Sequence, residues 1–126
     1  MINNRNGFTL VEFLVAIVIL MVGLLGLLQT INIAVDQSLG NVFRNEAVTV
    51  VDDMMMNKRA KAFGSVSTGE KTHPESRIVR GIPKTFTVTE TVEDISTNSK
   101  RISIEAVWTK KGSTFNHSAT SVISSN

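Results

Sequence analysis

After a short polar segment, the chain is apolar without interruption from residue 13 to residue 28. No ionisable residue follows until Asp36, so a helix formed here has no polar face of the kind a soluble-core helix needs. Counted from Phe8, such a helix is about 20 residues long at ~1.5 Å each, which matches the ~30 Å hydrocarbon layer of a bilayer. The pattern therefore predicts a membrane-spanning helix over about 8–29.

Beyond this segment the pattern changes from wholly apolar to periodic. Apolar residues recur in steps of three, four or eight, and the basic residues Lys58, Arg59 and Lys61 precede Gly64, as at the C-terminal end of a helix. We expect one long helix over 8–63, on the order of 84 Å in length, whose second half packs on a domain. The apolar stripe predicted for that half consists of Ile31, Val35, Leu39, Val42, Val50 and Met54.

The remaining residues, 64–126, read as a small β-sheet domain. Residues 64–83 are rich in Gly, Ser, Thr and charge, and we expect a loop there with one short strand over 77–79. From Lys84 apolar positions alternate with threonines, and two further alternating segments, 101–109 and 114–123, follow after turns. The expected fold class is α+β, a long N-terminal helix packed on an antiparallel β-meander.

The composition excludes most kinds of chemistry. The 126 residues include no cysteine, which rules out disulfides, thiol nucleophiles and cysteine zinc sites. The two histidines, His73 and His117, are far apart in sequence, and no catalytic triad pattern, phosphate loop or metal-ligand spacing is present. We expect a protein that is not an enzyme and uses no cofactor or metal. With about 60 residues after the helix and no disulfide, the sheet domain should be marginal without the helix surface.

The flanks of the apolar segment predict its orientation. Arg5 is the one charged residue ahead of Glu12, so the positive-inside tendency places the N-terminus in the cytoplasm and the rest of the chain across the membrane. The sequence after Leu28, QTINIAVDQS, offers no A-x-A type cleavage site, so the helix is expected to stay attached.

Glu12 requires an explanation, because a carboxylate within the hydrocarbon costs ~2.5 to 3.5 kcal/mol unless it finds a partner. No basic residue lies on the apolar helix to pair with it. Two interpretations remain open: Glu12 sits at the interface and extends into the lipid headgroups, or it contacts a positive group of another subunit.

The segment GFTLVE, residues 7–12, follows a short basic leader and precedes the apolar helix, and it resembles the type IV prepilin processing signature. The resemblance implies a leader peptide, residues 1–7, which prepilin peptidase removes after Gly7, and N-methylation of the new N-terminal residue, Phe8. It also implies a partner for Glu12, namely the α-amino group of Phe8 in a neighbouring subunit, which as a free amine is mostly cationic at neutral pH.

The apolar helix, with its GLLGL pattern at residues 23–27, looks most like that of minor pilins of the PilV kind. Major pilins often carry a proline where this chain has Gln29. The resemblance implies a minor pilin of a type IV pilus, held in the inner membrane with a periplasmic C-terminal domain and extracellular after assembly. Its partners would be other major and minor pilins, prepilin peptidase, the inner-membrane assembly platform and the membrane. The alternatives are a minor pseudopilin of a type II secretion system and a signal-anchored periplasmic binding domain that never polymerises.

Two basic pairs flank the strand expected over 101–109. Lys100, Arg101, Lys110 and Lys111 could form a basic patch that touches DNA or another anionic surface. The alternative is that these charges, at turns and strand ends, prevent edge-to-edge pairing of strands with another chain.

Overall fold

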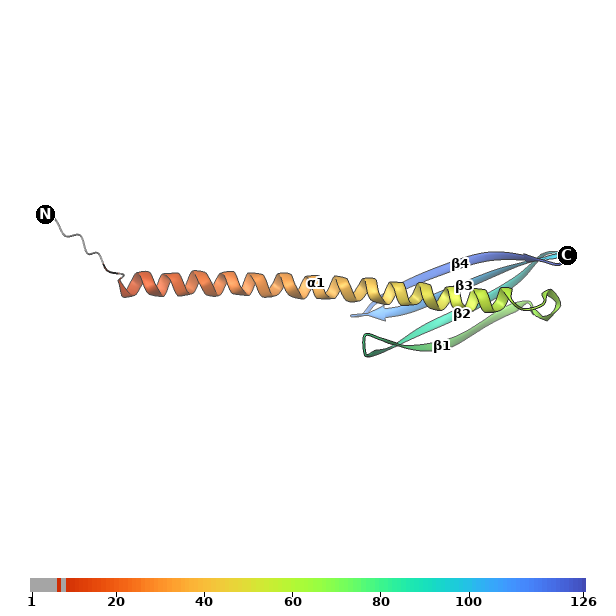
Figure 1. Cartoon of the computed structure of the whole chain (residues 1–126), viewed down its shortest axis with the longest axis horizontal. Helices are drawn as coiled ribbons and strands as arrows, with labels where there is room; N and C mark the ends of the chain where they lie inside the picture. Colours follow the sequence, from red (N-terminus) through yellow and green to blue (C-terminus); the bar gives the residue numbers. More distant parts are fainter. Residues whose placement is uncertain (1–6, 8) are drawn as a thin grey trace. The chain divides into compact units, whose positions relative to one another are not determined.

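The computed structural model describes Gly7 and residues 9–126, in two compact units, residues 1–38 and residues 39–126. A single helix, α1 (Leu10–Arg59), runs through both units, and the strands all belong to the second one, here called the sheet unit (Figure 1). The elements that follow α1 are η1 (Phe63–Ser65), β1 (Gly69–Val79), β2 (Ile82–Ser96), β3 (Ser99–Lys110) and β4 (Ser113–Ser124). The α+β fold class, with a long N-terminal helix packed on an antiparallel sheet, is confirmed.

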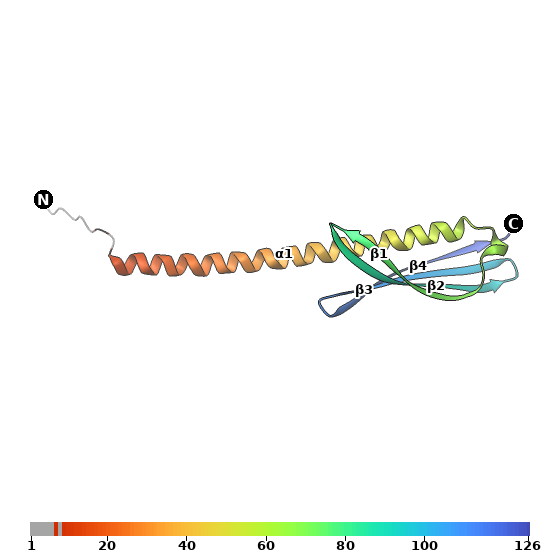
Figure 2. The ribbon, with the colours of Figure 1, turned by 90° about the horizontal axis from the view of Figure 1, so that it is seen from below.

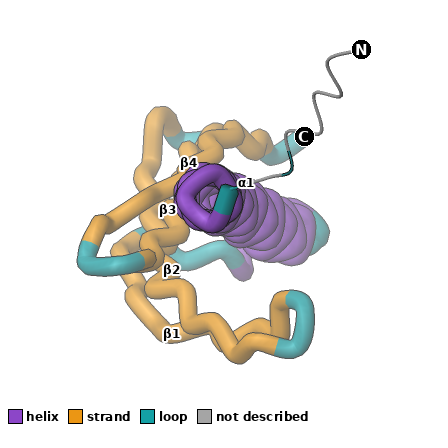
Figure 3. The backbone as a smooth tube through the Cα atoms, turned by 90° about the vertical axis from the view of Figure 1, so that its left-hand side faces the viewer, coloured by secondary structure: helices purple, strands orange, loops and turns teal. Residues whose placement is uncertain are grey.

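The sheet is a four-stranded antiparallel meander in the order β1-β2-β3-β4. Within the sheet unit, the helical segment 39–59 lies along one face of these strands (Figure 2), and the strands curve along its side (Figure 3). Each strand therefore pairs with its neighbour in sequence. A turn of two residues connects each successive pair of strands.

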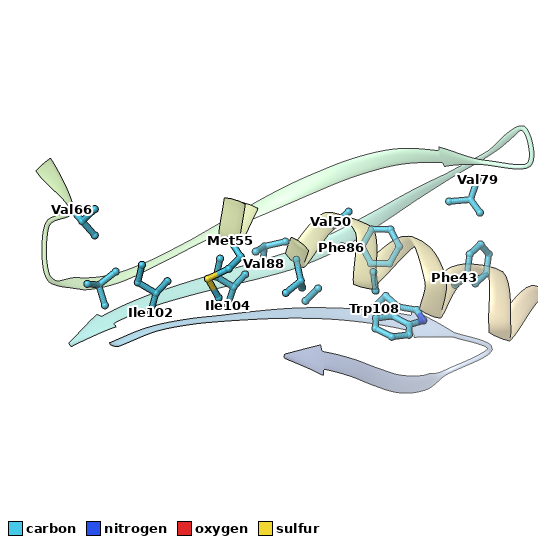
Figure 4. Packing of buried hydrophobic residues seen from close by; sticks show 14 residues of the cluster. Phe43, Val50, Met55, Val66, Val79, Phe86, Val88, Ile102, Ile104 and Trp108 are labelled. Carbon is cyan, nitrogen blue, oxygen red and sulfur yellow. The ribbon is translucent and has the colours of Figure 1, made fainter. Parts of the chain in front are cut away.

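The period-two alternation predicted for β2 and β3 decides which side chains enter the core. Phe86, Val88 and Val92 of β2 are buried, as are the apolar residues at alternate positions of β3. They pack against the helix as a single cluster (Figure 4). The members of the cluster are Phe43, Ala47, Val50, Val51, Met55, Val66, Val79, Phe86, Val88, Val92, Ile102, Ile104, Ala106 and Trp108.

The apolar stripe predicted for the helix is partly wrong. Ile31 and Val35 are exposed, and they belong to residues 1–38 rather than to the sheet unit. The buried helix residues are Phe43, Ala47, Val50, Val51 and Met55, while Leu39, Val42 and Met54 pack beside them with partial exposure. The stripe is offset because the sheet covers the helix only from Leu39 onward, so packing on the sheet and not periodicity alone selects the buried face.

The loop expected over 64–83 is also wrong, because residues 69–79 form the 11-residue strand β1. Its sequence lacks apolar alternation since it is an edge strand, held by backbone pairing to β2 along its whole length. Cross-strand hydroxyl pairs add to this pairing, Thr72–Thr89 and Ser76–Thr85, each with oxygens 3.1 Å apart. Pro74 is tolerated because an edge strand has one side on which an N–H is not needed.

The helix ends at Arg59, short of the expected residue 63. Phe63 instead opens the 3-10 turn η1, and a lysine from β3 fixes that turn. Lys100 Nζ donates to the carbonyl oxygen of Val66 at 2.6 Å and lies 4.7 Å from the centre of the Phe63 ring. This contact with the sheet competes with continuation of the helix.

Candidate assembly and processing segment

The helix begins with a reciprocal pair of hydrogen bonds between Thr9 and Glu12. The backbone N–H of Thr9 donates to Glu12 Oε2 at 3.1 Å, and the backbone N–H of Glu12 donates to Thr9 Oγ1 at 3.2 Å. The first intrahelical bond runs from Phe13 N–H to the Thr9 carbonyl oxygen at 3.1 Å. Thr9 and Glu12 therefore form a capping box, which satisfies two N–H groups that a helix start leaves without partners.

The sequence interpretation missed this role of Glu12, although a signal was present. Thr9-Leu10-Val11-Glu12 has the T-x-x-E spacing of a capping box directly before an apolar helix. A carboxylate in the first turn is also favoured by the helix dipole. Glu12 therefore has a local partner within the chain, which lowers the cost of placing it at the edge of the hydrocarbon.

The helix that follows offers its apolar surface on every side. Its most apolar 18-residue window has a mean hydropathy of 2.8, and none of that window is buried within the chain. Leu14, Ile19 and Leu25 are more than half exposed. The hydroxyl of Thr30 donates to the carbonyl oxygen of Gly26 at 3.0 Å, so this polar group is satisfied inside the helix. The segment thus meets the length and composition requirements of a membrane-spanning helix.

The predicted cleavage site is described in part. Gly7 lies outside the helix and is exposed, whereas Phe8 lies outside the described residues. A Cβ atom added at Gly7 would meet no heavy atom within 4 Å. Packing within the described part of the chain therefore does not require a glycine at this position.

The four residues of the predicted basic patch are divided between the two ends of β3. Lys100 and Arg101 stand at its start, where Lys100 binds the Val66 carbonyl and Arg101 Nη1 lies 3.5 Å from Glu93 Oε2. Lys110 ends β3 and Lys111 belongs to the following turn, which puts the two pairs about 30 Å apart at ~3.3 Å per residue. The structure does not bring the four residues together.

Neither histidine lies in a metal-binding cluster. His73, on β1, lines a hollow of about 270 Å³ beside Lys58, Lys61 and Lys71, and His117 is half-buried on β4. Within Gly7 and residues 9–126, no group of three or more His, Cys, Asp or Glu side chains could hold a metal ion.

Comparison with known families gives one match, to the prokaryotic N-terminal methylation motif over residues 2–28. The segment therefore carries the methylation motif of type IV pilins and pseudopilins. Within this motif segment lie Gly7, the capping box and most of the apolar helix. No curated protein and no solved structure matches the chain.

Proteins of the pilin and pseudopilin family are typically structural and not enzymatic, and the family implies prepilin peptidase and other pilins as partners. The apolar helix is consistent with anchoring in the inner membrane before a filament is assembled.

Proposed function

We propose that the chain is a minor pilin of a type IV pilus. Prepilin peptidase cleaves it between Gly7 and Phe8, Phe8 is N-methylated, and the helix over about 8–29 holds the mature chain in the inner membrane. The N-terminus is cytoplasmic and the sheet unit is periplasmic until the subunit enters a filament. The methylation motif supports this proposal most directly, because it includes most of an apolar helix whose most apolar window is not buried by any other described part of the chain.

Glu12 is proposed to join subunits. The capping box occupies Oε2, and among the described residues no hydrogen bond reaches Oε1. The α-amino group of Phe8 from a neighbouring subunit is the cation proposed to meet this oxygen. Because both charges lose hydration, the pair contributes more to the register of docking than to net binding energy.

Two variants test the role of Glu12. Glu12→Ala should still insert into the membrane and be processed, because the apolar helix and Gly7 are unchanged, yet enter filaments poorly. Glu12→Gln serves as the matched control, since the amide oxygen still accepts the Thr9 N–H bond while the charge is lost. The measurement is the amount of the chain in sheared, purified pili relative to the amount in membranes. Normal incorporation of both variants would contradict the proposed charge pair.

Mass spectrometry of the mature protein tests processing. A chain that begins at Phe8 and carries one additional methyl group is the expected product. A chain that retains Met1 would instead support a signal-anchored periplasmic binding domain that does not polymerise. Recovery of the processed chain with a secretion system, and its absence from sheared pili, would favour the alternative of a minor pseudopilin of type II secretion.

A further inference from the structure

Two hairpin turns of the sheet unit share an unusual choice of residue. The β1–β2 turn consists of Arg80 and Gly81 and the β3–β4 turn of Lys111 and Gly112, each between directly paired residues. All four have positive φ, 51° and 79° in the first turn and 50° and 79° in the second. Such turns favour Asn, Asp or Gly at the first position, because longer side chains are strained in the left-handed conformation. Both turns nevertheless place a long cationic side chain there.

The two turns lie at the same end of the sheet unit, beside the start of its helical segment. Lys110, next to the second turn, would lie 3.2 Å from a Cβ atom placed on Gly40. Val79, which precedes the first turn, is at the same end of the core as Phe43 and Trp108, whereas Val66 is at the other end (Figure 4). This end, here called the hairpin end, consists of residues 39–45, 78–86 and 106–117.

Cations outnumber carboxylates at the hairpin end, although Glu46 and Glu105 directly adjoin its segments. Its three segments contain five Lys or Arg residues and no Asp or Glu, whereas the remainder of residues 39–126 contains nine Asp or Glu and seven Lys or Arg. Within the described part of the chain, no carboxylate lies within 4 Å of Arg44, Arg80 or Lys84. The five cations are Arg44, Arg80, Lys84, Lys110 and Lys111.

Aromatic rings hold two of these cations at the hairpin end. The Arg44 guanidinium lies 5.9 Å from the centre of the Trp108 ring, and Lys84 Nζ lies 5.0 Å from the centre of the Phe43 ring. Lys84 Nζ also donates to the carbonyl oxygen of Thr109. Beside Arg80, two isoleucines of the first hairpin face solvent, with Ile78 78% and Ile82 45% exposed. The hairpin end thus combines fixed cations with exposed apolar side chains, as surfaces that bind anionic lipid do.

The length of the intervening chain keeps this end near a bilayer. Ten residues, 29–38, connect the apolar segment to the sheet unit, and fully extended they span at most about 35 Å. The headgroup layer of one leaflet is about 5 to 7 Å thick, and its surface potential extends roughly 8 Å further at physiological ionic strength. The sheet unit is therefore tethered to the bilayer by a short segment, and its cations can reach this potential.

We infer that the hairpin end binds the anionic phospholipid headgroups of the bilayer in which the apolar helix is anchored. The inference depends on the membrane-anchored stage of the proposed function and does not depend on filament assembly. Arg80 and Lys111 approach the phosphates, and Ile78 and Ile82 enter the headgroup layer.

The test uses the full-length chain in lipid nanodiscs and takes advantage of its lack of cysteine. A fluorophore is attached to Ser113→Cys, beside the second turn, or to Thr97→Cys in the β2–β3 turn, and the lipid headgroups carry a quencher. One set of nanodiscs contains phosphatidylcholine alone, and in the other phosphatidylglycerol replaces a third of it. We expect quenching at position 113 to rise several-fold in the anionic nanodiscs and to fall with added salt, while quenching at position 97 stays unchanged.

Substitution of the turn residues provides the matched comparison. Arg80→Asn with Lys111→Asn removes two charges and keeps residues that tolerate positive φ, so the sheet unit should melt at an unchanged or higher temperature. This double variant should lose most of the quenching that depends on phosphatidylglycerol. The double variant Lys61→Asn with Arg101→Asn also removes two positive charges, but away from the hairpin end, and it should retain this quenching.

Four outcomes would overturn the inference. Equal quenching at positions 113 and 97, or quenching at 113 that is independent of lipid charge, would refute it while leaving the proposed function intact. Equal loss in the two double variants would show a non-specific charge effect. A chain that fails to co-purify with nanodiscs would refute membrane anchoring itself, and with it both proposals.

Discussion

The Glu12 side chain has a role in the helix cap and a proposed role between subunits. Its Oε2 completes the capping box with Thr9, which satisfies backbone groups at the start of a helix that continues into apolar surroundings. The carboxylate therefore has a structural role in the isolated chain as well as the proposed role between subunits. Thr9 is the residue that distinguishes these roles, because it contributes to the cap and carries no charge.

Thr9→Ala should loosen the first turn of α1 without affecting the charge of Glu12. Loss of the hydroxyl cap costs about 0.5–2 kcal/mol of helix stability. Amide hydrogen exchange in lipid bicelles should show faster exchange at Glu12 and Phe13, whose N–H groups bond to Thr9, and unchanged exchange from about Leu20 onward. Thr9→Ser keeps an oxygen that accepts the Glu12 N–H bond, so it should exchange like the wild-type chain, and faster exchange in this variant would contradict the capping role.

At the scale of elements, β2, β3 and the first part of α1 could be predicted from sequence because each carries one strong pattern. The apolar window and the alternation at Phe86, Val88 and Ile104 depend on local composition alone. β1 could not be predicted, since an edge strand that contributes Val79 alone to the core has no need of alternating apolar residues. The offset of the buried helix face depends on where the sheet covers α1, which the sequence of α1 does not contain.

The residues of the candidate site were likewise predictable from the sequence only in part. The motif around Gly7 and Glu12 was recognised from consecutive residues, and the capping box was recognisable from the T-x-x-E spacing. The hairpin end was not, because Arg44, Arg80 and Lys111 are far apart in sequence and are brought to one end only by the meander. Spacing along the chain instead suggested a patch that joined Lys100 to Lys110, although one strand separates them.

The inner face of β3 should determine the stability of the sheet unit. Ile104 is fully buried between strands and helix, so Ile104→Ala should cost about 2–5 kcal/mol by lost burial and an unfilled cavity. Val122→Ala is the matched control on β4, because Val122 is 52% exposed and its truncation should change stability by about 0.5 kcal/mol or less. Urea unfolding followed by Trp108 fluorescence measures both, and similar losses in the two variants would contradict the assigned faces.

At the scale of the molecule, the sheet unit has one core, which its helical segment and its strands form together. Five of the fourteen buried apolar residues come from α1, and Phe86, Ile104 and Trp108 lie in the cluster that they complete. Without cysteine, no disulfide can compensate for their loss. The sheet and the second part of α1 are thus one folding unit, even though α1 is continuous with the apolar segment.

Truncation measures this dependence. A fragment of residues 31–126 should unfold cooperatively, whereas residues 64–126 should show no cooperative transition, because the latter exposes the inner sheet face. Circular dichroism and Trp108 fluorescence during heating provide the comparison. Equal, cooperative melting of the two fragments would show that the strands form a self-sufficient core.

The meander order also determines the order in which the strands can pair as the chain emerges. Synthesis releases α1 first and then one strand at a time, and each new strand finds its hydrogen-bonding neighbour already present in the strand just before it. No strand must wait for a distant strand in order to pair, so the sheet can grow outward from β1 to β4 as the chain emerges on the periplasmic side proposed for it. Local strand pairing of this kind favours rapid formation of the sheet, and it limits the time during which the apolar face of α1 is exposed.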